Sequence, residues 1–238
     1  MAEFFRRVEK KYIISKEQYL RIKEILNEKM VEDEHGKSTI CNLYFDTNNF
    51  DLIMHSISKP YYKDKVRLRS YNIPDLDSNV YLEIKKKCGG IVGKRRIQML
   101  LKDYYTYINN FGEIKEEVQV INELDYYFKF YHLQPTMFLS YYRRAYYGKD
   151  NMDFRITFDS NIIARNHDLK LENGNYGTQI LGEDKYIMEI KTLGAMPMWC
   201  VKILDELKIV PCGFSKYGEA YTQLILNANN MKRREFIC

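Results

Sequence analysis

The stretch Lys65-Val66-Arg67-Leu68-Arg69-Ser70-Tyr71 determines how the rest of the chain is interpreted. Successive side chains of a strand point to opposite faces, so a strand here has one apolar face and one polar face. The apolar face carries Val66 and Leu68, and the polar face carries Lys65, Arg67, Arg69 and Tyr71. Like charges side by side repel one another, so three cations on one face need an anion to offset them. Taken alone, such a strand is usually a surface strand whose charged face is solvated.

The same alternation recurs along the chain, in residues 7–11, 81–87, 94–99, 153–159 and 187–191. A solvated sheet face usually mixes positive and negative charges, whereas cations outnumber acids on the polar faces of several of these stretches. If the sheet closes into a barrel, one set of faces must point inward. We therefore expect an α+β fold, in which an antiparallel β-barrel with a charged interior is flanked by helices that cover its apolar outer faces. Such an interior is a channel for a polyanion.

Length and composition are compatible with one large domain that spans residues 1–238. The hydrophobic content of 45% supports a sizeable core, and the net charge of +5 is modest for 238 residues. Proteins that bind duplex nucleic acid usually have a larger basic excess or a recognisable motif. The sequence has no zinc finger, helix-turn-helix or RNP-type aromatic pair, so we expect no duplex nucleic acid partner.

Cysteine and histidine usage argues against disulfides and against structural zinc. The five cysteines are odd in number, widely spaced and without a CxxC motif, which is typical of a reduced cytoplasmic chain. The four histidines are scattered and form neither HxxxH nor HExxH. The first residues lack the apolar region of a secretory signal, and no apolar run approaches the ~18–20 residues that span a bilayer. We therefore expect a cytoplasmic chain without a membrane segment.

Hydrophobic periodicity, caps and turn residues predict the order of the elements. Strands are expected at residues 4–14, 38–46, 63–71, 79–88, 91–101, 136–147, 152–160 and 185–192. Helices are expected at residues 16–30, 47–57, 104–110, 116–131, 197–207 and 218–229, and Ser15 is expected to cap the first of them. Residues 166–182 are polar and are expected to form a loop.

Three short motifs could bind phosphate, but each is weak alone. Gly89-Gly90-Ile91-Val92-Gly93-Lys94 resembles part of a P-loop, yet it lacks the spacing and the following Ser or Thr, so a Gly-rich hairpin turn is favoured. Arg7-Val8-Glu9-Lys10-Lys11 is by itself most often a salt-bridged strand. Phe214-Ser215-Lys216-Tyr217-Gly218 precedes an expected helix, where backbone N–H groups and Lys216 can hold a phosphate.

Taken together and in order, eight stretches resemble one known family. They are Arg7 to Tyr12, Tyr44-Phe45-Asp46, Val66-Arg67-Leu68-Arg69, Leu82-Glu83-Ile84-Lys85, Tyr142-Arg143-Arg144-Ala145, Phe154-Arg155-Ile156-Thr157-Phe158-Asp159, Met188-Glu189-Ile190-Lys191 and Phe214-Ser215-Lys216-Tyr217. This set resembles the VTC domain, the polyphosphate polymerase domain of the vacuolar transporter chaperone complex, which lies within the triphosphate tunnel (CYTH-like) superfamily. The resemblance covers roughly residues 5–226.

The resemblance implies an antiparallel tunnel in which the γ-phosphoryl group of ATP is added to a growing polyphosphate chain, with Mn²⁺ or Mg²⁺ as cofactor. It assigns catalytic roles to Lys11, Arg67, Arg69 and Lys216, and phosphate binding to Lys85, Lys94, Arg143, Arg155 and Ser215. It assigns the metal to Glu189. Physically, phosphoryl transfer relies on positioning and charge neutralisation, and a hard cation suits one carboxylate plus phosphate oxygens and waters.

One departure from the family pattern bears on the activity. The hydrolytic tunnel enzymes begin with Glu-x-Glu-x-Lys, and here Arg7 replaces the first Glu, which favours binding of a long polyanion over metal-dependent triphosphate hydrolysis. The SPX domain and transmembrane helices of the eukaryotic proteins are not found in this sequence, so coupling to membrane translocation does not follow from the resemblance. Two other functions stay open: a tunnel triphosphatase or nucleotide cyclase, and a non-catalytic polyphosphate-binding module.

Overall fold

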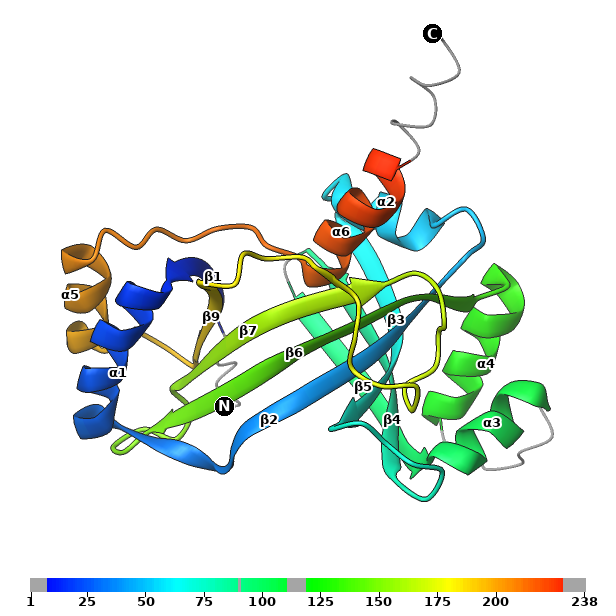
Figure 1. Cartoon of the computed structure of the whole chain (residues 1–238), viewed down its shortest axis with the longest axis horizontal. Coiled ribbons are helices and arrows are strands. Elements are labelled where there is room, and N and C mark those ends of the chain that lie inside the picture. The colour runs from blue at the N-terminus through cyan, green and yellow to red at the C-terminus, as the bar shows by residue number, and fades with distance from the viewer. Residues whose placement is uncertain (1–7, 90, 111–118, 229–238) are drawn as a thin grey trace, which may run out of the picture. The chain divides into compact units, whose positions relative to one another are not determined.

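A computed structural model describes residues 8–89, 91–110 and 119–228 (Figure 1). Its strands are β1 Val8–Ser15, β2 Met30–Asp46, β3 Tyr62–Tyr71, β4 Asn79–Cys88, β5 Ile91–Leu100, β6 Gln134–Gly148, β7 Arg155–Arg165, β8 Thr178–Gln179 and β9 Lys185–Thr192. Its helices are α1 Lys16–Lys29, α2 Asp51–Ile57, α3 Leu101–Asn109, α4 Gln119–Tyr131, α5 Met198–Glu206 and α6 Lys216–Tyr221, and a π-helical turn, Thr222–Leu226, follows α6.

The strands form one sheet in the order β1-β9-β7-β6-β2-β3-β4-β5, and β8 pairs with β7. The pairs β1–β9, β9–β7, β2–β3, β3–β4 and β4–β5 are all antiparallel. The predicted fold class, an α+β fold with an antiparallel sheet and flanking helices, is confirmed. The hydrogen-bonded order ends at β1 and β5, so the strands that the structure describes form an open series.

Most predicted elements are present because the residues that predict each one lie within it or directly beside it in the sequence. The strands at 79–88 and 185–192 have the predicted bounds. Ser15 caps α1 as predicted: the Ser15 hydroxyl accepts a hydrogen bond from the Gln18 N–H at 3.1 Å, and the Gln18 side chain accepts one from the Ser15 N–H at 2.9 Å. This reciprocal pair is a capping box, which satisfies two N–H groups that a helix start leaves open.

Several predicted bounds were wrong. The helix predicted at 47–57 begins at Asp51, the helix predicted at 104–110 begins at Leu101, and the loop predicted at 166–182 contains β8. The strand predicted at 38–46 starts at Met30. The prediction missed the first half of this strand because the charged residues that follow Met30 do not alternate with apolar ones. The strand predicted at 152–160 starts only at Arg155, because the turn after Gly148 extends to Phe154 through hydrogen bonds at both ends. The helix predicted from 218 already begins at Lys216.

Some predictions fall outside the described residues. These are the start of the strand at 4–14, Gly90 of the predicted turn, the start of the helix at 116–131 and the end of the helix at 218–229. In the part of the chain that the structure covers, no helix combines the length and the apolar character needed to cross a bilayer.

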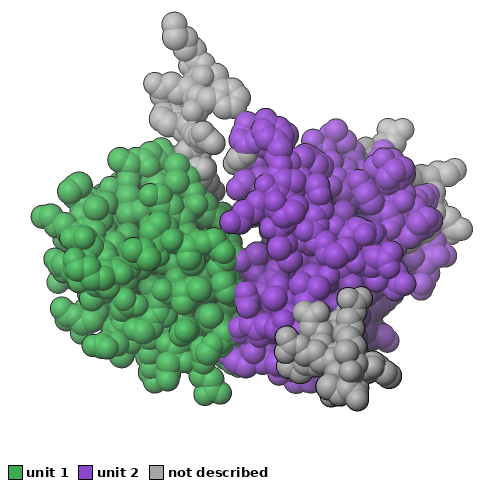
Figure 2. All heavy atoms as spheres, turned by 90° about the horizontal axis from the view of Figure 1, so that it is seen from above, with its two compact units in different colours: residues 1–38, 141–162, 181–214 green, residues 39–140, 163–180, 215–238 purple. Residues whose placement is uncertain are grey.

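The chain forms two compact units (Figure 2). Unit 1 contains residues 1–38, 141–162 and 181–214, and unit 2 contains residues 39–140, 163–180 and 215–238. Strands β2, β6 and β7 contribute residues to both units. The prediction of a single domain over residues 1–238 stays a prediction, and each unit is described below by itself.

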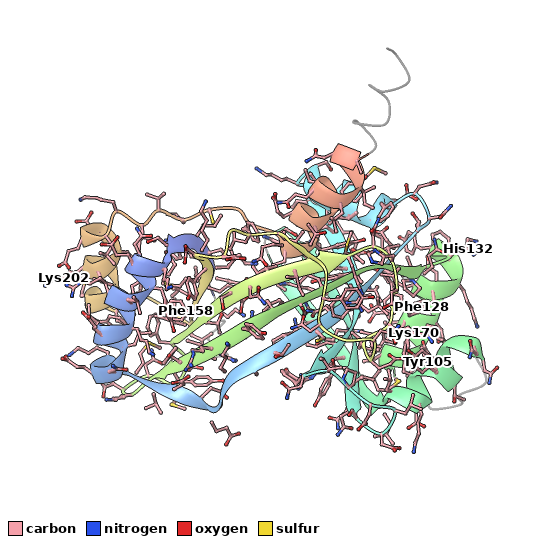
Figure 3. The ribbon with its side chains drawn as sticks, in the orientation of Figure 1. Tyr105, Phe128, His132, Phe158, Lys170 and Lys202 are labelled. Atoms are coloured by element: carbon pink, nitrogen blue, oxygen red, sulfur yellow. The ribbon has the colours of Figure 1, made fainter. Side chains whose placement is uncertain are left out.

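In unit 1, the apolar faces of β1, β7 and β9 pack against α1 and α5. The predicted apolar face of β7, which contains Phe158 (Figure 3), is buried there as expected. The helices contribute Tyr19, Ile22, Leu26, Cys200, Ile203 and Leu204 to this core. The polar faces of the same strands are thereby left on the side away from these helices.

In unit 2, α3 and α4 cover the apolar faces of β3 and β4. Val66 and Leu68 are buried and lie opposite Ile84 and Leu82 in the antiparallel register. The helices contribute Leu101, Tyr104, Tyr107, Ile121, Leu124, Tyr127 and Phe128 (Figure 3). The stretch at 65–71 therefore has its apolar face in a core, as predicted, and its cations project from the opposite face.

Candidate functional site

The polar side of β3, β4 and β5 in unit 2 carries a regular array of cations, which we call the cationic face. Residues directly opposite each other on neighbouring strands share a face. The register aligns four rows: Arg69–Tyr81–Gln98, Arg67–Glu83–Arg96, Lys65–Lys85–Lys94 and Lys63–Lys87–Val92. These rows contain eight cations and one carboxylate, so the cationic face has a large excess of positive charge.

Glu83 is the carboxylate of this face, and it is only 1% exposed. Its Oε2 accepts hydrogen bonds from Arg67 Nε at 2.8 Å and Nη2 at 2.7 Å, and its Oε1 lies 2.5 Å from Lys94 Nζ. Burial alone would raise the pKa of Glu83, but Arg67, Arg69 and Lys94 lower it to about 2. Glu83 is therefore ionised and holds in place Arg67, predicted to be catalytic, and Lys94, predicted to bind phosphate.

Lys94 is the second cation held by Glu83. Its pKa is lowered mainly by burial, the contact with Glu83 acts in the opposite direction, and the positive charges of Arg67 and Arg69 add smaller lowering effects. A lysine beside a buried carboxylate would ordinarily gain a proton more readily. Burial therefore outweighs the attraction to Glu83 at Lys94, and the nearby arginines act in the same direction as burial.

Strand β2 supports the two arginines of the cationic face. Arg69, 8% exposed, donates from Nε to Asn42 Oδ1 at 3.0 Å, and Arg67 donates from Nη1 to the Tyr44 hydroxyl at 3.2 Å. The Tyr44 ring stacks on Tyr217, with ring centres 4.4 Å apart. Burial would raise the pKa of Tyr44, but Arg67, Lys65 and Arg69 lower it to about 8.

The start of α6 lies against the same face. Lys65 Nζ donates to the Ser215 hydroxyl at 2.9 Å, and this hydroxyl also caps α6 by accepting from the Gly218 N–H at 3.1 Å. Lys216 is the first residue of α6. The buried Tyr217 hydroxyl, which donates to Asp46 at 2.9 Å, anchors the segment. The structure therefore brings the predicted Ser215 to the cationic face.

Unit 1 has a second charged array on β1, β9 and β7, which we call the balanced face. Its rows are Glu9–Lys191–Arg155 and Lys11–Glu189–Thr157. Lys11 Nζ lies 3.6 Å from Glu9 and 3.4 Å from Glu189. Lys191 Nζ lies 3.7 and 3.8 Å from the same two carboxylates. Acids and cations alternate here, so charge compensation within the protein is much more complete than on the cationic face.

Arg143 of β6 belongs to unit 1 and is held by an acid that the sequence analysis did not assign. Its Nε and Nη2 donate to the two carboxylate oxygens of the buried Asp159 at 2.6 and 2.7 Å, and Nη2 lies 3.9 Å from Glu189. Burial would lower the pKa of Arg143, but Asp159 raises it well above its ordinary value. Arg143 is therefore a fixed, paired cation.

The metal predicted at Glu189 fits only as an ion that phosphate oxygens also coordinate. Across the described ranges, no three His, Cys, Asp or Glu side chains are grouped to hold an ion by themselves. Glu189 is 7% exposed, and directly across the register lies Thr157, 1% exposed, whose hydroxyl has no hydrogen-bond partner. One carboxylate and one hydroxyl, completed by phosphate oxygens and waters, is a donor set that Mg²⁺ or Mn²⁺ accepts.

The predicted site residues thus fall into two groups. Arg67, Arg69, Lys85, Lys94, Ser215 and Lys216 belong to unit 2, and Lys11, Arg143, Arg155 and Glu189 belong to unit 1. The sequence analysis did not assign Tyr44, Lys65, Glu83, Arg96 or Asp159. All except Tyr44 lie on polar strand faces that alternation had already identified, and Tyr44 lies in a motif of the family resemblance, so these two signals could have found them.

Binding of a polyanion to the cationic face should raise the pKa of Tyr44. Nearby cations lower that pKa to about 8 despite burial, and a bound triphosphate would offset their charges. Binding above pH 8 then requires proton uptake by Tyr44, so triphosphate affinity should fall as the pH rises through 8. Tyrosinate absorbance, titrated with and without triphosphate, measures the shift.

Two variants separate this effect from the titration of lysines. Tyr44→Phe should bind triphosphate with a weaker pH dependence around pH 8. Tyr105→Phe removes a hydroxyl from α3, where it donates to Glu172 away from the cationic face, and should behave like the unchanged protein. An identical pH dependence in Tyr44→Phe and the unchanged protein would contradict the assignment.

The chain is similar to one protein family and to several solved structures. The family model described as the VTC domain matches residues 6–225. The Hippeastrum protein HpAC1, described as a candidate adenylyl cyclase with a dominant triphosphatase activity, is 16% identical over 89% of this chain and 93% of its own, with a TM-score of 0.50. A candidate adenylate cyclase from Vibrio parahaemolyticus is 11% identical over 90% and 96% of the two chains, with a TM-score of 0.47. A search among curated proteins found no match.

Proposed function

Because the chain belongs to the VTC domain family and has the triphosphate tunnel fold, we propose that it is a polyphosphate polymerase. It would transfer the γ-phosphoryl group of ATP to the end of an inorganic polyphosphate chain. The observation that carries the proposal is the cationic face, where eight cations surround one carboxylate. Such an excess destabilises the empty protein by self-repulsion, and a linear polyanion offsets it.

The cationic face supplies what phosphoryl transfer needs. Arg67 and Arg69 are planar forks that can bind phosphate oxygens in pairs, and contacts with Glu83 and Asn42 hold them in position. Lys85 and Lys94 add point charges in the adjacent row. Because the transition state is stabilised mainly by positioning and charge neutralisation, fixed cations of this kind can provide most of the catalysis.

The reaction requires no nucleophile from the protein. A terminal oxygen of polyphosphate attacks the γ-phosphorus of ATP, a new P–O bond forms, the bond from the γ-phosphorus to the bridging oxygen breaks, and ADP leaves. Ser215 and Lys216, at the start of α6, would hold phosphate oxygens beside Lys65. In unit 1, Lys11, Arg143 and Arg155 would bind phosphate, and Glu189 would hold Mn²⁺ or Mg²⁺, which adds further neutralisation of phosphate charge when bound.

The test is incubation with ATP and Mn²⁺, followed by a gel stained for polyphosphate and by assays of ADP, orthophosphate and pyrophosphate. We expect polymer and ADP, with little orthophosphate. Arg67→Ala should lower both polyanion binding and synthesis. Lys170→Ala removes an exposed cation of unit 2 that lies beside Tyr105 (Figure 3), off the cationic face, and should leave both unchanged.

Other products would overturn the proposal in favour of a named alternative. Orthophosphate without polymer indicates a triphosphatase, and pyrophosphate indicates a nucleotide cyclase. Polyphosphate binding without turnover indicates a non-catalytic binding module. A cytoplasmic location and the lack of a duplex nucleic acid partner remain predictions from composition.

A further inference from the structure

The cationic face extends one row beyond the residues predicted from the sequence. Its fourth row places Lys63 directly opposite Lys87, with Val92 as the third member. Like charges directly opposite each other on neighbouring strands are destabilising. Lys63 Nζ donates to the Ser56 carbonyl oxygen at 3.4 Å, which brings Lys63 to the segment that carries Lys59. The pKa of Lys63 is lowered, first by burial and then by the charges of Lys87 and Lys59.

On β3, exposure increases from the innermost row outward. The Arg69 residue is 8% exposed and the Arg67 side chain 19%, while Lys87 of β4 and Lys59 are exposed. On β3 the arginines occupy the two inner rows, whereas Arg96 of β5 is exposed, and only lysines are found among the cations of the two outer rows. Planar arginine forks suit fixed binding, whereas lysine is a flexible point charge. From its inner rows to its outer rows, the cationic face of β3 and β4 therefore changes from fixed arginine side chains to flexible, solvated lysine side chains.

The length of the face exceeds that of a triphosphate. Same-face residues are two positions apart, so four rows span about 20 Å along the strands. Three phosphorus atoms joined by single bridging oxygens are shorter than this and cannot contact every row. A ligand that offsets the charge of all four rows must be a longer linear polyanion.

We propose that Lys59, Lys63 and Lys87 form an outer subsite for inorganic polyphosphate. This subsite binds the part of a long chain that extends beyond the phosphates held by Arg67, Arg69, Lys85 and Lys94. It gives the protein a higher affinity for long chains than for triphosphate, independently of any contact to the reacting phosphates. The inference rests on the proposed function, because it takes polyphosphate as the ligand.

The test compares two double variants of unit 2. Lys63→Gln/Lys87→Gln removes two charges of the outer row. Lys129→Gln/Lys170→Gln removes two exposed charges, from α4 and from the loop beside Tyr105 (Figure 3), and serves as the matched control. Affinities for tripolyphosphate and for long-chain polyphosphate are measured at several salt concentrations, without metal or ATP, together with the melting temperature of the empty proteins.

We expect the outer-row variant to bind tripolyphosphate like the unchanged protein and long polyphosphate roughly fivefold more weakly. Its salt dependence for the long chain should be shallower, because fewer cations contact the polyanion. The empty variant should melt at a higher temperature than the unchanged protein, because repulsion between Lys63 and Lys87 is removed. The control variant should show none of these changes.

Three outcomes would overturn the subsite. They are unchanged affinity for long polyphosphate, an equal loss for tripolyphosphate, and an equal loss in the control variant. Tighter binding of single-stranded RNA with the same number of phosphates, lost in the outer-row variant, would assign the row to nucleic acid instead. Failure of the unchanged protein to bind either phosphate polymer would overturn the proposed function itself, which is a separate result.

Discussion

Replacing Glu189 by glutamine should abolish metal-dependent polymer synthesis and leave metal-free binding of tripolyphosphate intact. Glutamine keeps the shape of the side chain and loses the charge that a hard cation requires. Synthesis should fall by orders of magnitude at every Mn²⁺ concentration, because no second carboxylate faces Thr157 across the strand register. Tripolyphosphate affinity without metal should hold or rise, because the variant has one less negative charge.

The competing explanation is that Glu189 holds its unit together. It lies 3.4 Å from Lys11, 3.8 Å from Lys191 and 3.9 Å from Arg143. Each of these cations contacts another carboxylate, since both lysines contact Glu9 and Arg143 pairs with Asp159. Loss of the Glu189 charge leaves Lys11 and Lys191 sharing Glu9 and Arg143 paired with Asp159, so the free energy of unfolding should change less than in a variant that leaves a buried cation unpaired.

Glu32→Gln is the matched control for this experiment. Glu32 also belongs to unit 1 and pairs with Arg144 at 2.6 Å, next to Tyr19 and Tyr146. The control should lose a similar, small amount of stability and keep its normal synthesis and metal dependence. Near-normal synthesis by Glu189→Gln at ordinary Mn²⁺ would rule out the metal role. A large drop in melting temperature, with metal dependence retained, would establish the structural role instead.

Replacing Glu83 by glutamine should have the largest effect on stability. Glu83 is 1% exposed and contacts Arg67 and Lys94, and the Arg67 side chain is only 19% exposed. Removing one partner of a buried ion pair leaves an uncompensated charge, which typically costs about 3 kcal/mol. The melting temperature at neutral pH and low salt should therefore fall by several degrees.

Tripolyphosphate should rescue this variant more than it stabilises the unchanged protein. The bound polyanion supplies the negative charge that Glu83 provided to Arg67 and Lys94. A ligand that binds only the folded state adds about 2.7 kcal/mol at a hundredfold excess over Kd, and a tighter Kd in the variant increases this value. High salt should reduce the rescue by screening.

The acid limb of the stability curve provides an independent check. The folded-state pKa of Glu83 is lowered from 4.5 to about 2. The contribution of the Glu83 charge to the free energy of unfolding is therefore complete above pH 4.5 and is lost as the pH falls toward 2. The difference in unfolding free energy between the unchanged protein and Glu83→Gln should shrink across this range, as measured by denaturant titration at each pH.

Glu123→Gln separates this effect from the general loss of an ion pair. Glu123 of α4 also lies between two cations, Lys86 and Arg95, but on the helix-covered side of β4 and β5. The Glu123→Gln variant should be less stable than the unchanged protein, and tripolyphosphate should stabilise the two proteins equally. Equal rescue of both variants, or unchanged stability of Glu83→Gln, would contradict the role of Glu83 in the cationic face.

The sequence was sufficient for features that depend on local order. The period of two in residues 65–71 and 81–87 placed the cations of unit 2 on one strand face, and the structure agrees because each backbone is extended there. Ser15 and Gln18 were sufficient to start α1 because a capping box needs only four consecutive residues. The first half of β2 was missed because its charged residues carry no apolar alternation, so pairing with neighbouring strands determines it.

Tertiary structure alone decided which charges are paired. Arg67 and Arg143 look equivalent in the sequence, yet Arg143 is held by both oxygens of Asp159, while Arg67 shares one buried carboxylate with Lys94 in a face that keeps a positive excess. Each arginine and its acid lie 16 residues apart on consecutive strands, and a pairing energy depends on separation and burial, which the strand register and the surrounding fold determine. Alternation thus determined that the protein has charged strand faces, and strand register decided which face is left in need of an anion.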